Sequence, residues 1–284
     1  MNRLSDPELW EYIRGDLPYF DLTTHLLALP PQSGTLRIYT RETVVAACTE
    51  EAVRIGELLG CEAKTNCASG TEVVAGGMLL ELRGTHETLH NAWRLCQILL
   101  EYACGMATRA HTMLQKARAV NPHCEVLVTR KSFPFAKRFV IRALTSGGAL
   151  PHRLGLSETV LVFEQHRVLY PDKAAFAAAL KTLKLRCVEK KLTVESEVLE
   201  DAKWLLSLGV DVIQMDKCTP QTLQELVAYK NGHYPHATVL AAGGINPANA
   251  AEYAATGVEG LVTSSLYQAG MADLTARWES HGSD

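Results

Sequence analysis

VLVTRKSFPFAKRFVIRALTSGGALPHRLGLS, residues 126–157, decides how this chain of 284 residues is organised. The stretch begins as an apolar, β-branched run, and its first charges come where that run ends. It contains no Asp or Glu, although the whole chain has a formal net charge of −3. Two basic pairs, Arg130-Lys131 and His152-Arg153, each lie beside a structural break. Such pairs can converge on one polyanionic ligand, because Arg binds carboxylate or phosphate as a fork and Lys supplies a movable point charge.

Three more basic residues of this stretch, Lys137, Arg138 and Arg142, recur at helical spacing. They form either the solvated face of a helix or a part of the same basic cluster. The hydrophobic content of 47% and the charged content of 21% are ordinary for a globular protein. Because the chain as a whole is slightly acidic, a general nucleic-acid binder is excluded, and the basic cluster is a local site.

The cysteines and the N-terminal residues favour a cytoplasmic protein without a membrane partner. None of the eight cysteines occurs in a C-x-x-C motif or in a Cys/His cluster of the kind that binds zinc. Most lie among apolar neighbours, so buried free thiols in a reducing compartment are favoured over disulfides. The charged N-terminus lacks the apolar core of a signal peptide, and no apolar run approaches the length of a membrane span.

After Asn121-Pro122 the chain alternates short apolar runs with amphipathic helical patterns. Continuous apolar strands that alternate with such helices are typical of a parallel sheet covered on its outside. Six strands are too few for the eight-stranded barrel, so we expect an α/β fold with a smaller or incomplete barrel. A doubly wound open sheet is the alternative. The apolar runs are 126–128, 159–163, 192–194, 212–215, 238–241 and 261–263, and the helical patterns are 135–145, 172–183, 197–208, 219–229 and 247–255.

The first third of the chain predicts an α+β unit of few strands. A long helical pattern covers 87–119, and Gly105 interrupts it, which allows two packed helices. We expect one domain over 1–115 and a barrel domain over 116–269, with the tail 270–284 returning to the first domain as a helix. The expected strands of the first domain are 35–39 and 43–48, which form one pair around a charged turn, and 71–74 and 78–82, which form a second pair.

Polar residues follow several of the predicted barrel strands at their carboxyl ends, where barrel enzymes build their sites. Glu195 and Asp216 end two consecutive strands, so we expect them to face each other across one side of the barrel mouth. Two carboxylates opposite a basic cluster can hold Mg²⁺ through their oxygens, with substrate phosphates completing the coordination. Alternatively, each carboxylate simply pairs with an Arg or Lys of the cluster.

Two turns near the end of the chain predict phosphate-binding sites. In AAGGINPANA, 241–250, a glycine turn leads into a helix whose first turn holds Pro247. A second turn follows the last strand, and phosphate binding after the last two strands recurs in barrels. A tight turn alone would also explain the two glycines. The donors are the backbone N–H groups of Gly243, Gly244 and Ile245 and the polar groups of Ser264 and Ser265.

A basic cluster, a carboxylate pair and phosphate-binding turns suit a substrate that carries phosphate and diphosphate. Mg²⁺-assisted loss of diphosphate from an activated sugar phosphate uses all three. The sugar carbon passes through a state with oxocarbenium character, so Lys131, Glu195 and Asp216 would act by positioning and electrostatic stabilisation. No nucleophile is needed, and the sequence contains no G-x-S-x-G, P-loop or G-x-G-x-x-G motif.

The segments TRKSFP, GGALPHRLGLSE, VES, DVIQMD and AAGGINPANAAEYAATGVEGLV resemble the quinolinate phosphoribosyltransferase family in order and spacing. GDLPYFDLTT is similar to the family's opening segment and WRLCQILLEYACGMATRAH to its interdomain helix, so the likeness covers nearly the whole chain. It implies an N-terminal α/β sandwich domain, an open α/β barrel of the type II phosphoribosyltransferase kind, and phosphoribosyl diphosphate and a heteroaromatic acid as substrates. Within the family the chain most resembles the ModD branch, whose members are associated with molybdenum transport.

The resemblance also implies roles for individual residues. Arg94 matches an arginine that reaches into the neighbouring subunit's site, which implies a homodimer whose active site is completed across the interface. By position, the residues that grip the dicarboxylate and phosphates are Arg130, Lys131, His152 and Arg153, the acidic pair near Mg²⁺ and ribose is Glu195 and Asp216, and the phosphate loop contains Gly243 and Gly244.

The chain departs from the family pattern in its candidate site. Phe163 stands where the family has a lysine, and losing that cation removes a charge-assisted contact of about 1.5–3 kcal/mol. We therefore predict phosphoribosyl transfer to an acceptor other than quinolinate. The alternatives are quinolinate transfer in NAD biosynthesis and a non-catalytic protein that binds an anion or nucleotide in connection with molybdenum transport. The other departures are Lys217 for Asn, Pro151 for Asn, Ser264 for Gly and Gln268 for His.

Overall fold

The computed structural model describes residues 3–28 and 32–281, and the chain divides into two compact units. The helical middle of the basic stretch belongs to the first unit, whereas both basic pairs belong to the second. No helix in the described part of the chain combines the length and the apolar character that crossing a bilayer requires. The first unit contains the described residues up to His111, Phe133–Gly148 and the described residues from Tyr267, and the second contains Thr112–Ser132 and Ala149–Leu266.

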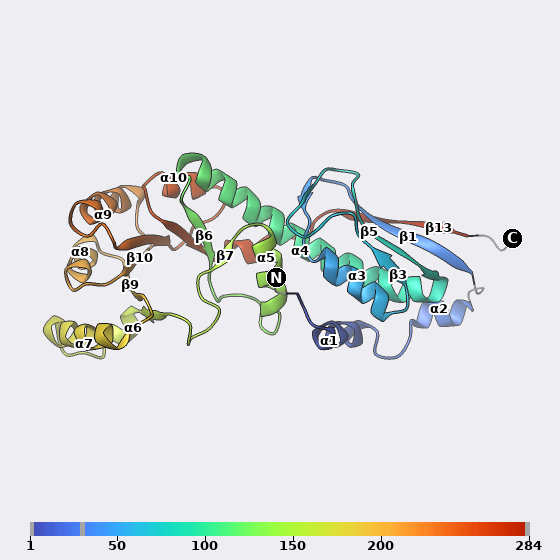
Figure 1. Ribbon diagram of the computed structural model, residues 1–284, viewed down its shortest axis with the longest axis horizontal. Helices are drawn as coiled ribbons and strands as arrows, with labels where there is room; N and C mark the ends of the chain where they lie inside the picture. The colour runs from blue at the N-terminus through green and yellow to red at the C-terminus, as the bar shows by residue number, and fades with distance from the viewer. Residues whose placement is uncertain (1–2, 29–31, 282–284) are drawn as a thin grey trace. The chain divides into compact units, whose positions relative to one another are not determined.

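An antiparallel sheet forms the core of the first unit (Figure 1). Its strands, in order across the sheet, are β13 (Leu274–Ser280), β1 (Ser33–Thr40), β5 (Met78–Thr85) and β3 (Glu62–Lys64). Alternation along β1 separates its two faces, because successive side chains of a strand point in opposite directions. Leu36 and Ile38 are fully buried, and Arg37 between them pairs with Glu81 on β5, with Nε 2.6 Å from Oε2. The apolar face packs against α3 (Thr49–Leu58).

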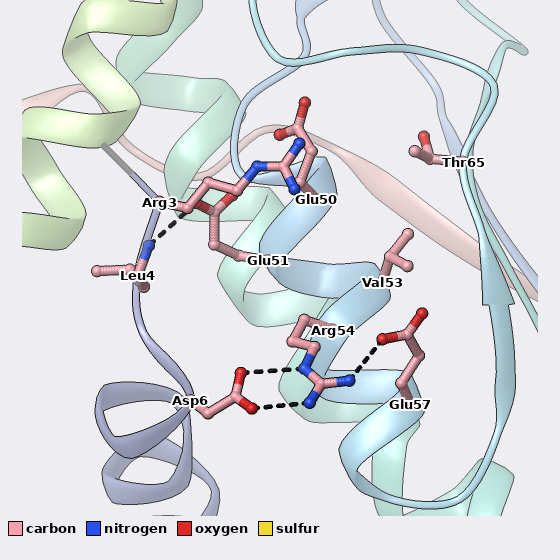
Figure 2. A pocket seen from close by; sticks show the side chains of 9 residues that line it. All are labelled: Arg3, Leu4, Asp6, Glu50, Glu51, Val53, Arg54, Glu57 and Thr65. Carbon is pink, nitrogen blue, oxygen red and sulfur yellow. Dashed lines mark hydrogen bonds and ion pairs between the residues drawn. The ribbon is translucent and has the colours of Figure 1, made fainter. Parts of the chain in front are cut away.

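Polar contacts join the N-terminal segment to α3. The helix α1 (Asp6–Asp16) begins after Ser5, whose backbone N–H donates to the Glu8 carboxylate at 2.9 Å. Figure 2 shows Arg54 of α3 between two acids: it donates to both carboxylate oxygens of Asp6 at 3.0 and 2.7 Å, and to Glu57 at 2.8 Å. In the same view, the backbone N–H of Leu4 donates to Glu51 at 3.3 Å. The short helix α2 (Leu22–Leu27) follows α1.

The basic face predicted for residues 137–142 is not solvated throughout. Arg142 of α5 (Lys137–Ser146) is only 4% exposed and lies 3.1 Å from a carboxylate oxygen of Glu51 and 2.8 Å from one of Glu50. Arg138 on the same helix pairs with Glu8 at 3.0 Å. These arginines therefore hold the first unit together instead of joining the basic pairs of the second.

The predicted strand pairs of the first domain are wrong in their partners. The strand β2 (Val44–Val45) pairs with β4 (Glu72–Val73), whereas β1 pairs with β5 and β13. The tail is also not a helix, since Leu274–Ser280 forms the edge strand β13; the last three residues of the predicted helix lie outside the described residues. β1 takes its partners from distant parts of the chain, so a local pattern cannot identify them.

The helix α4 runs from His86 to Val120 without a break at Gly105. Gly105 serves instead for a close approach: a Cβ there would lie 2.3 Å from the carbonyl oxygen of Gly270. The backbone N–H of Ala272 donates to the carbonyl of Glu101 at 2.9 Å, which attaches the segment before β13 to this helix. The glycine is required by packing and does not end the helix.

A parallel sheet forms the core of the second unit (Figure 1). Its strands, in order, are β7 (Leu150–Pro151), β6 (Glu125–Val128), β12 (Gly260–Thr263), β11 (Thr238–Ala242), β10 (Val212–Asp216), β9 (Leu192–Ser196) and β8 (Val160–Val162). Each strand from β8 to β12 lies beside the next along the chain, and β12 returns to pair with β6, as in a barrel. Within the described residues β7 and β8 do not pair, so the ring is open there. The expectation of an incomplete barrel is confirmed, and the doubly wound sheet is excluded.

The two faces of this sheet differ in what covers them. Ile213, Met215 and Val239 point outward and are fully buried under helices. Val212 and Leu240 point inward, where they form a second apolar cluster with Ala242 and Val262. The helices α8 and α9 lie side by side along the outer face (Figure 1). The helical elements of this part of the chain are α6 (Glu164–Arg167), α7 (Lys173–Arg186), α8 (Leu199–Ser207), α9 (Pro220–His233), α10 (Ala250–Ala254) and η1 (Ser265–Gln268).

Replacing Gly105 by alanine should destabilise the protein by about 1–3 kcal/mol, because the added methyl group clashes with the Gly270 carbonyl. Alanine is otherwise the better helix former by roughly 0.5–1 kcal/mol. Gly232→Ala is the matched control, since a Cβ at that position of α9 meets no atom within 4 Å. Urea unfolding should show a lower midpoint for Gly105→Ala and an unchanged or higher one for Gly232→Ala. Equal midpoints for both variants would contradict the packing role of Gly105.

Candidate active site

Predicted site residues meet at the carboxyl edge of the parallel sheet in the second unit. Aligned residues of neighbouring parallel strands point to the same face, and side chains alternate along each strand. The register aligns Leu161 with Thr193, Glu195 with Gln214, and Leu127 with both Val262 and Leu150. Counting in steps of two from these inward positions identifies the inner side chains at the strand ends. They are His152, Phe163, Glu195, Asp216 and Ser264.

Glu195 is a half-buried carboxyl group at this edge. Its Oε2 accepts a hydrogen bond of 2.6 Å from the side-chain amide of Gln214. Burial raises the pKa of Glu195, and the neighbouring carboxylates Asp216 and Glu197 raise it further, whereas the Gln214 hydrogen bond and the charge of Lys131 act in the opposite direction. Asp216 ends the neighbouring strand β10 on the same inner face, so the two carboxylates lie at one edge of the sheet.

Asp216 pairs with Lys217 rather than with the basic cluster. The Lys217 ammonium lies 3.2 Å from Oδ2 of Asp216 and 3.3 Å from Oε1 of Glu197, and both contacts raise the pKa of Lys217. The Lys217 backbone is left-handed, with φ of 54°, and its N–H donates to the carbonyl of Ala242 at 3.0 Å. A Cβ on Gly243 would lie 2.5 Å from Lys217 N and 2.7 Å from Oδ1 of Asp216, so only glycine allows this approach.

The loop after β11 presents backbone donors at the same edge. Gly243 and Gly244 have φ of 81° and 73°, and within the described residues the N–H groups of Gly243, Gly244 and Ile245 donate to no acceptor. The side chains of Asn246 and Asn249 both donate to the Gly244 carbonyl, at 3.0 and 3.1 Å, and so hold the loop in shape. The predicted helix start at Pro247 is wrong: α10 begins at Ala250, because these asparagine contacts form turns first. The loop therefore offers its N–H groups without a long helix behind them.

Thr263 connects the two predicted phosphate-binding turns. Its hydroxyl donates to the carbonyl of Ile245 at 2.6 Å, and it accepts a hydrogen bond of 3.0 Å from the N–H of Ser265. The hydroxyls of Thr263 and Ser265 are 2.9 Å apart. Ser264 between them is half-buried and points to the inner face. The two turns thus form one connected surface.

The cationic side chains of the basic pairs lie outside the ion pairs formed among the described residues. Arg130, Lys131 and Arg153 form no ion pair with Asp or Glu anywhere in residues 3–28 or 32–281. Burial lowers the pKa of Arg153, and the charge of Arg130 lowers it further. Burial also lowers the pKa of His152, together with the charge of Arg153, so a neutral imidazole is favoured.

Phe163 contacts the second basic pair. The Arg153 guanidinium carbon lies 5.7 Å from the centre of the Phe163 ring, within the range of a cation–π contact. The ring also stacks on His166 at 6.0 Å, and the N–H of Phe163 donates to Nδ1 of His166 at 3.0 Å. Since Arg153 follows β7 and Phe163 follows β8, this contact bridges the strands at which the barrel is open.

Three features of the site lie outside what the sequence indicated. Gln214 was missed: it is 5% exposed, holds Glu195, and its Oε1 has no hydrogen-bond partner within the described residues. One amide in an apolar strand, VIQMD, was the signal that could have found it. Glu197 was missed because it lies just after β9, which ends at Ser196, and sequence reasoning considered the residues that end the strands. Arg94 is not among these residues; it lies exposed on α4 in the first unit, with its guanidinium carbon 4.4 Å from the centre of the Trp93 ring.

The raised pKa of Glu195 predicts how its replacement changes stability with pH. The folded protein binds a proton at Glu195 more tightly than the unfolded chain, whose ordinary value is 4.5, so the contribution to stability is complete below that pH. It is lost as the pH rises through the raised pKa. Urea unfolding of Glu195→Gln, which stays uncharged, should therefore show a gain in stability over the wild type as the pH rises from about 4 to about 7.

Glu252→Gln, which removes an exposed carboxylate of α10, is the matched control for this comparison. If the wild type instead gains stability over Glu195→Gln between the two pH values, the assigned direction is wrong.

Comparison with known sequences identifies the family. The family model of the quinolinate phosphoribosyl transferase N-terminal domain matches residues 21–104, and that of the C-terminal domain matches residues 106–275. "Putative pyrophosphorylase ModD" of Rhodobacter capsulatus is 42% identical over 248 residues, which cover 87% of this chain and 95% of that protein. The protein of the same name from Pasteurella multocida is 34% identical and covers 95% of this chain and 96% of its own length.

Solved structures show the same fold. NadC from Streptococcus pyogenes has a TM-score of 0.88 at 19% identity, covering 99% of this chain and 100% of that one. The nicotinate-nucleotide pyrophosphorylase of Francisella tularensis has a TM-score of 0.87 at 20% identity, with 98% of each chain covered. These findings confirm the resemblance and the combination of an N-terminal α/β domain with an open barrel. The chain belongs to the quinolinate phosphoribosyl transferase family and is an enzyme of the phosphoribosyltransferase class.

Proposed function

We propose that this enzyme transfers the phosphoribosyl group of phosphoribosyl diphosphate to a heteroaromatic, anionic acceptor in a Mg²⁺-dependent reaction. One observation carries the proposal. At a single edge of the parallel sheet lie a pair of carboxylates, cations that pair with no acid in the described part of the chain, and backbone N–H donors that have no acceptor there. A substrate with a diphosphate, a phosphate and a sugar carbon that becomes positively charged needs all three kinds of group.

Different residues of this edge have different roles in the proposed reaction. The acceptor ring nitrogen forms a bond to C1 of the ribose while the bond from C1 to the diphosphate oxygen breaks, and the diphosphate leaves with the electron pair. Arg130, Lys131 and Arg153 bind and orient the anionic groups of the two substrates. The carboxylates of Glu195 and Asp216 stabilise the positive charge that develops on the sugar. The N–H groups of the Gly243 loop and the turn of Ser264-Ser265 bind phosphate oxygens.

The donor set fits Mg²⁺. This ion prefers oxygen ligands and is commonly bound by one or two carboxylates together with substrate phosphates. Burial raises the pKa of Glu195 and the neighbouring carboxylates raise it further, so a cation at this position would relieve repulsion between like charges. Within the part of the chain that the structure describes, no group of three or more His, Cys, Asp or Glu side chains could hold a metal. Glu195 and Asp216 would therefore hold the ion together with the diphosphate, whose charge it would neutralise.

Phe163 supports an acceptor other than quinolinate. An aromatic ring at this position offers the acceptor a stacking surface and no charge for a second carboxylate. Its contact with Arg153 leaves one guanidinium over the ring, at 5.7 Å from its centre. This arrangement suits an acceptor that has a flat ring and one anionic group rather than two.

The oligomeric state, location and biological role of the enzyme are proposed from the family resemblance and the cysteines. We propose a homodimer in which Arg94, which is exposed on α4, completes the site of the neighbouring subunit. A cytoplasmic location is supported by the cysteines, since all eight are free thiols and only Cys187 is partly exposed. The resemblance to the ModD branch, whose name the two relatives carry, is the reason for also proposing a role connected with molybdenum transport.

Screening heteroaromatic acids with phosphoribosyl diphosphate and Mg²⁺ tests the function through release of diphosphate. Lys131→Met and Arg153→Met should each lower kcat/KM by about 100-fold, because each removes a charge that binds the substrate anions. Lys191→Met, which removes an exposed lysine at the amino end of β9, is the matched control and should leave the rate unchanged. Phosphoribosyl diphosphate binding that Mg²⁺ does not affect, without turnover of any acceptor, would favour the non-catalytic alternative.

The acceptor assignment is tested by restoring the family lysine. Phe163→Lys should raise kcat/KM for quinolinate by about tenfold or more, since a charge-assisted contact is worth about 1.5–3 kcal/mol. Phe163→Leu, which removes the ring without adding charge, should not. Formation of nicotinate mononucleotide from quinolinate measures both variants. A wild type that already prefers quinolinate over other heteroaromatic acids would contradict the assignment.

A further inference from the structure

Lys217 places an ammonium between two carboxylates at the candidate metal site. Its Nζ lies 3.2 Å from Asp216, at the end of β10, and 3.3 Å from Glu197, which follows β9. The side chain of Lys217 is 71% exposed, so both of its ion pairs are in contact with solvent. The ammonium is therefore held by charge and backbone geometry and can leave its partners without crossing an apolar core.

The backbone around Lys217 is strained in a way that aims this side chain. A φ of 54° is left-handed, a region that residues other than glycine, asparagine and aspartate seldom adopt. The N–H of Lys217 is bound to the carbonyl of Ala242 at 3.0 Å, and Gly243 packs against both Lys217 N and Asp216 Oδ1. Contacts between the loops after β10 and β11 thus maintain the conformation, as is common where strain serves a site.

We infer that Lys217 is a tethered cation that competes with a free divalent metal ion for Asp216, so that the ion enters the site together with the substrate diphosphate. The inference rests on the proposed metal-dependent function. A divalent ion at Asp216 in the free enzyme would replace or face an ammonium at short range, and like charges repel. When diphosphate is present, its oxygens complete the coordination of the metal and offer the ammonium another anionic partner.

The size of the effect follows from the exposure of the pair. Ion pairs in contact with solvent contribute little, and salt weakens them further. Removing the ammonium should therefore strengthen the binding of a divalent ion to the free protein by on the order of tenfold at low ionic strength, and by less at high salt. An effect of this size is measurable as a shift of a binding curve.

Mn²⁺ binding to the protein without substrate tests the inference, followed through the electron paramagnetic resonance signal of free Mn²⁺. Lys217→Asn removes the charge and keeps a residue that tolerates the left-handed backbone. Lys217→Arg keeps the charge. Lys191→Asn is the matched control, because it removes one exposed lysine of the same unit at the opposite end of the strands. Lys217→Asn should bind Mn²⁺ about tenfold more tightly than the wild type, and the other two variants should match the wild type.

The outcomes separate the inference from the function on which it rests. Unchanged or weaker Mn²⁺ binding by Lys217→Asn overturns the competition. If wild-type binding is nevertheless lost on Asp216→Asn, the proposed metal site stands. A gain by Lys217→Asn that persists in the double variant with Asp216→Asn places the metal elsewhere and overturns both. An equal gain in Lys191→Asn would show an effect of net charge alone and overturns the inference.

Discussion

The parallel register of the sheet in the second unit decides which side chains can act together. Because side chains alternate with a period of two, a shift of one residue in any strand would turn its terminal polar group to the outer, helix-covered face. The outer positions are filled by fully buried residues such as Ile213, Met215 and Val239, which have no room for charge. Packing of the helices thus fixes the register, and the register turns Glu195 and Asp216 inward.

A second constraint acts where the strands end. Gly243 lies so close to Lys217 and Asp216 that a side chain at this position would displace either the β10 loop or the acid itself. The hydroxyl of Thr263 holds the next turn through the Ile245 carbonyl. Three consecutive strand ends are therefore linked by backbone approach and short hydrogen bonds. Their polar groups are positioned before any substrate arrives, which is the condition for electrostatic stabilisation without reorganisation.

Sequence reasoning succeeded where local periodicity carries the information. Continuous apolar runs between amphipathic helices predicted the parallel sheet, and residues at the ends of those runs, Glu195 and Asp216, lie on neighbouring strands as expected. It failed where a feature depends on distant parts of the chain. The two-residue strand β7 has no apolar run of its own. The strand β1 pairs with β13 in the tail, whose residues lie about 240 positions further along the chain.

The same limit applies to single residues. Gly105 looked like a helix break because its contact with Gly270 cannot be read from neighbouring residues. Arg142 looked solvated because Glu50 and Glu51, which bury it, lie far away in sequence. Gln214 has its hydrogen-bond partner on the next strand. In each case the residue contacts a partner that is distant in sequence and comes close only in the folded structure.

The order of the strands also gives the open barrel a polarity. Cations follow β6 and β7, backbone donors follow β11 and β12, and acids follow β9 and β10, where Lys217 pairs with Asp216 and Glu197. The remaining gap lies between β7 and β8, and there Arg153 rests over the ring of Phe163. A lysine at position 163 would repel this guanidinium, whereas the ring attracts it. Phe163, one of the residues that depart from the family pattern, is thus also the one that joins the two edges of the barrel mouth, so its replacement would alter the shape of the mouth as well as its charge.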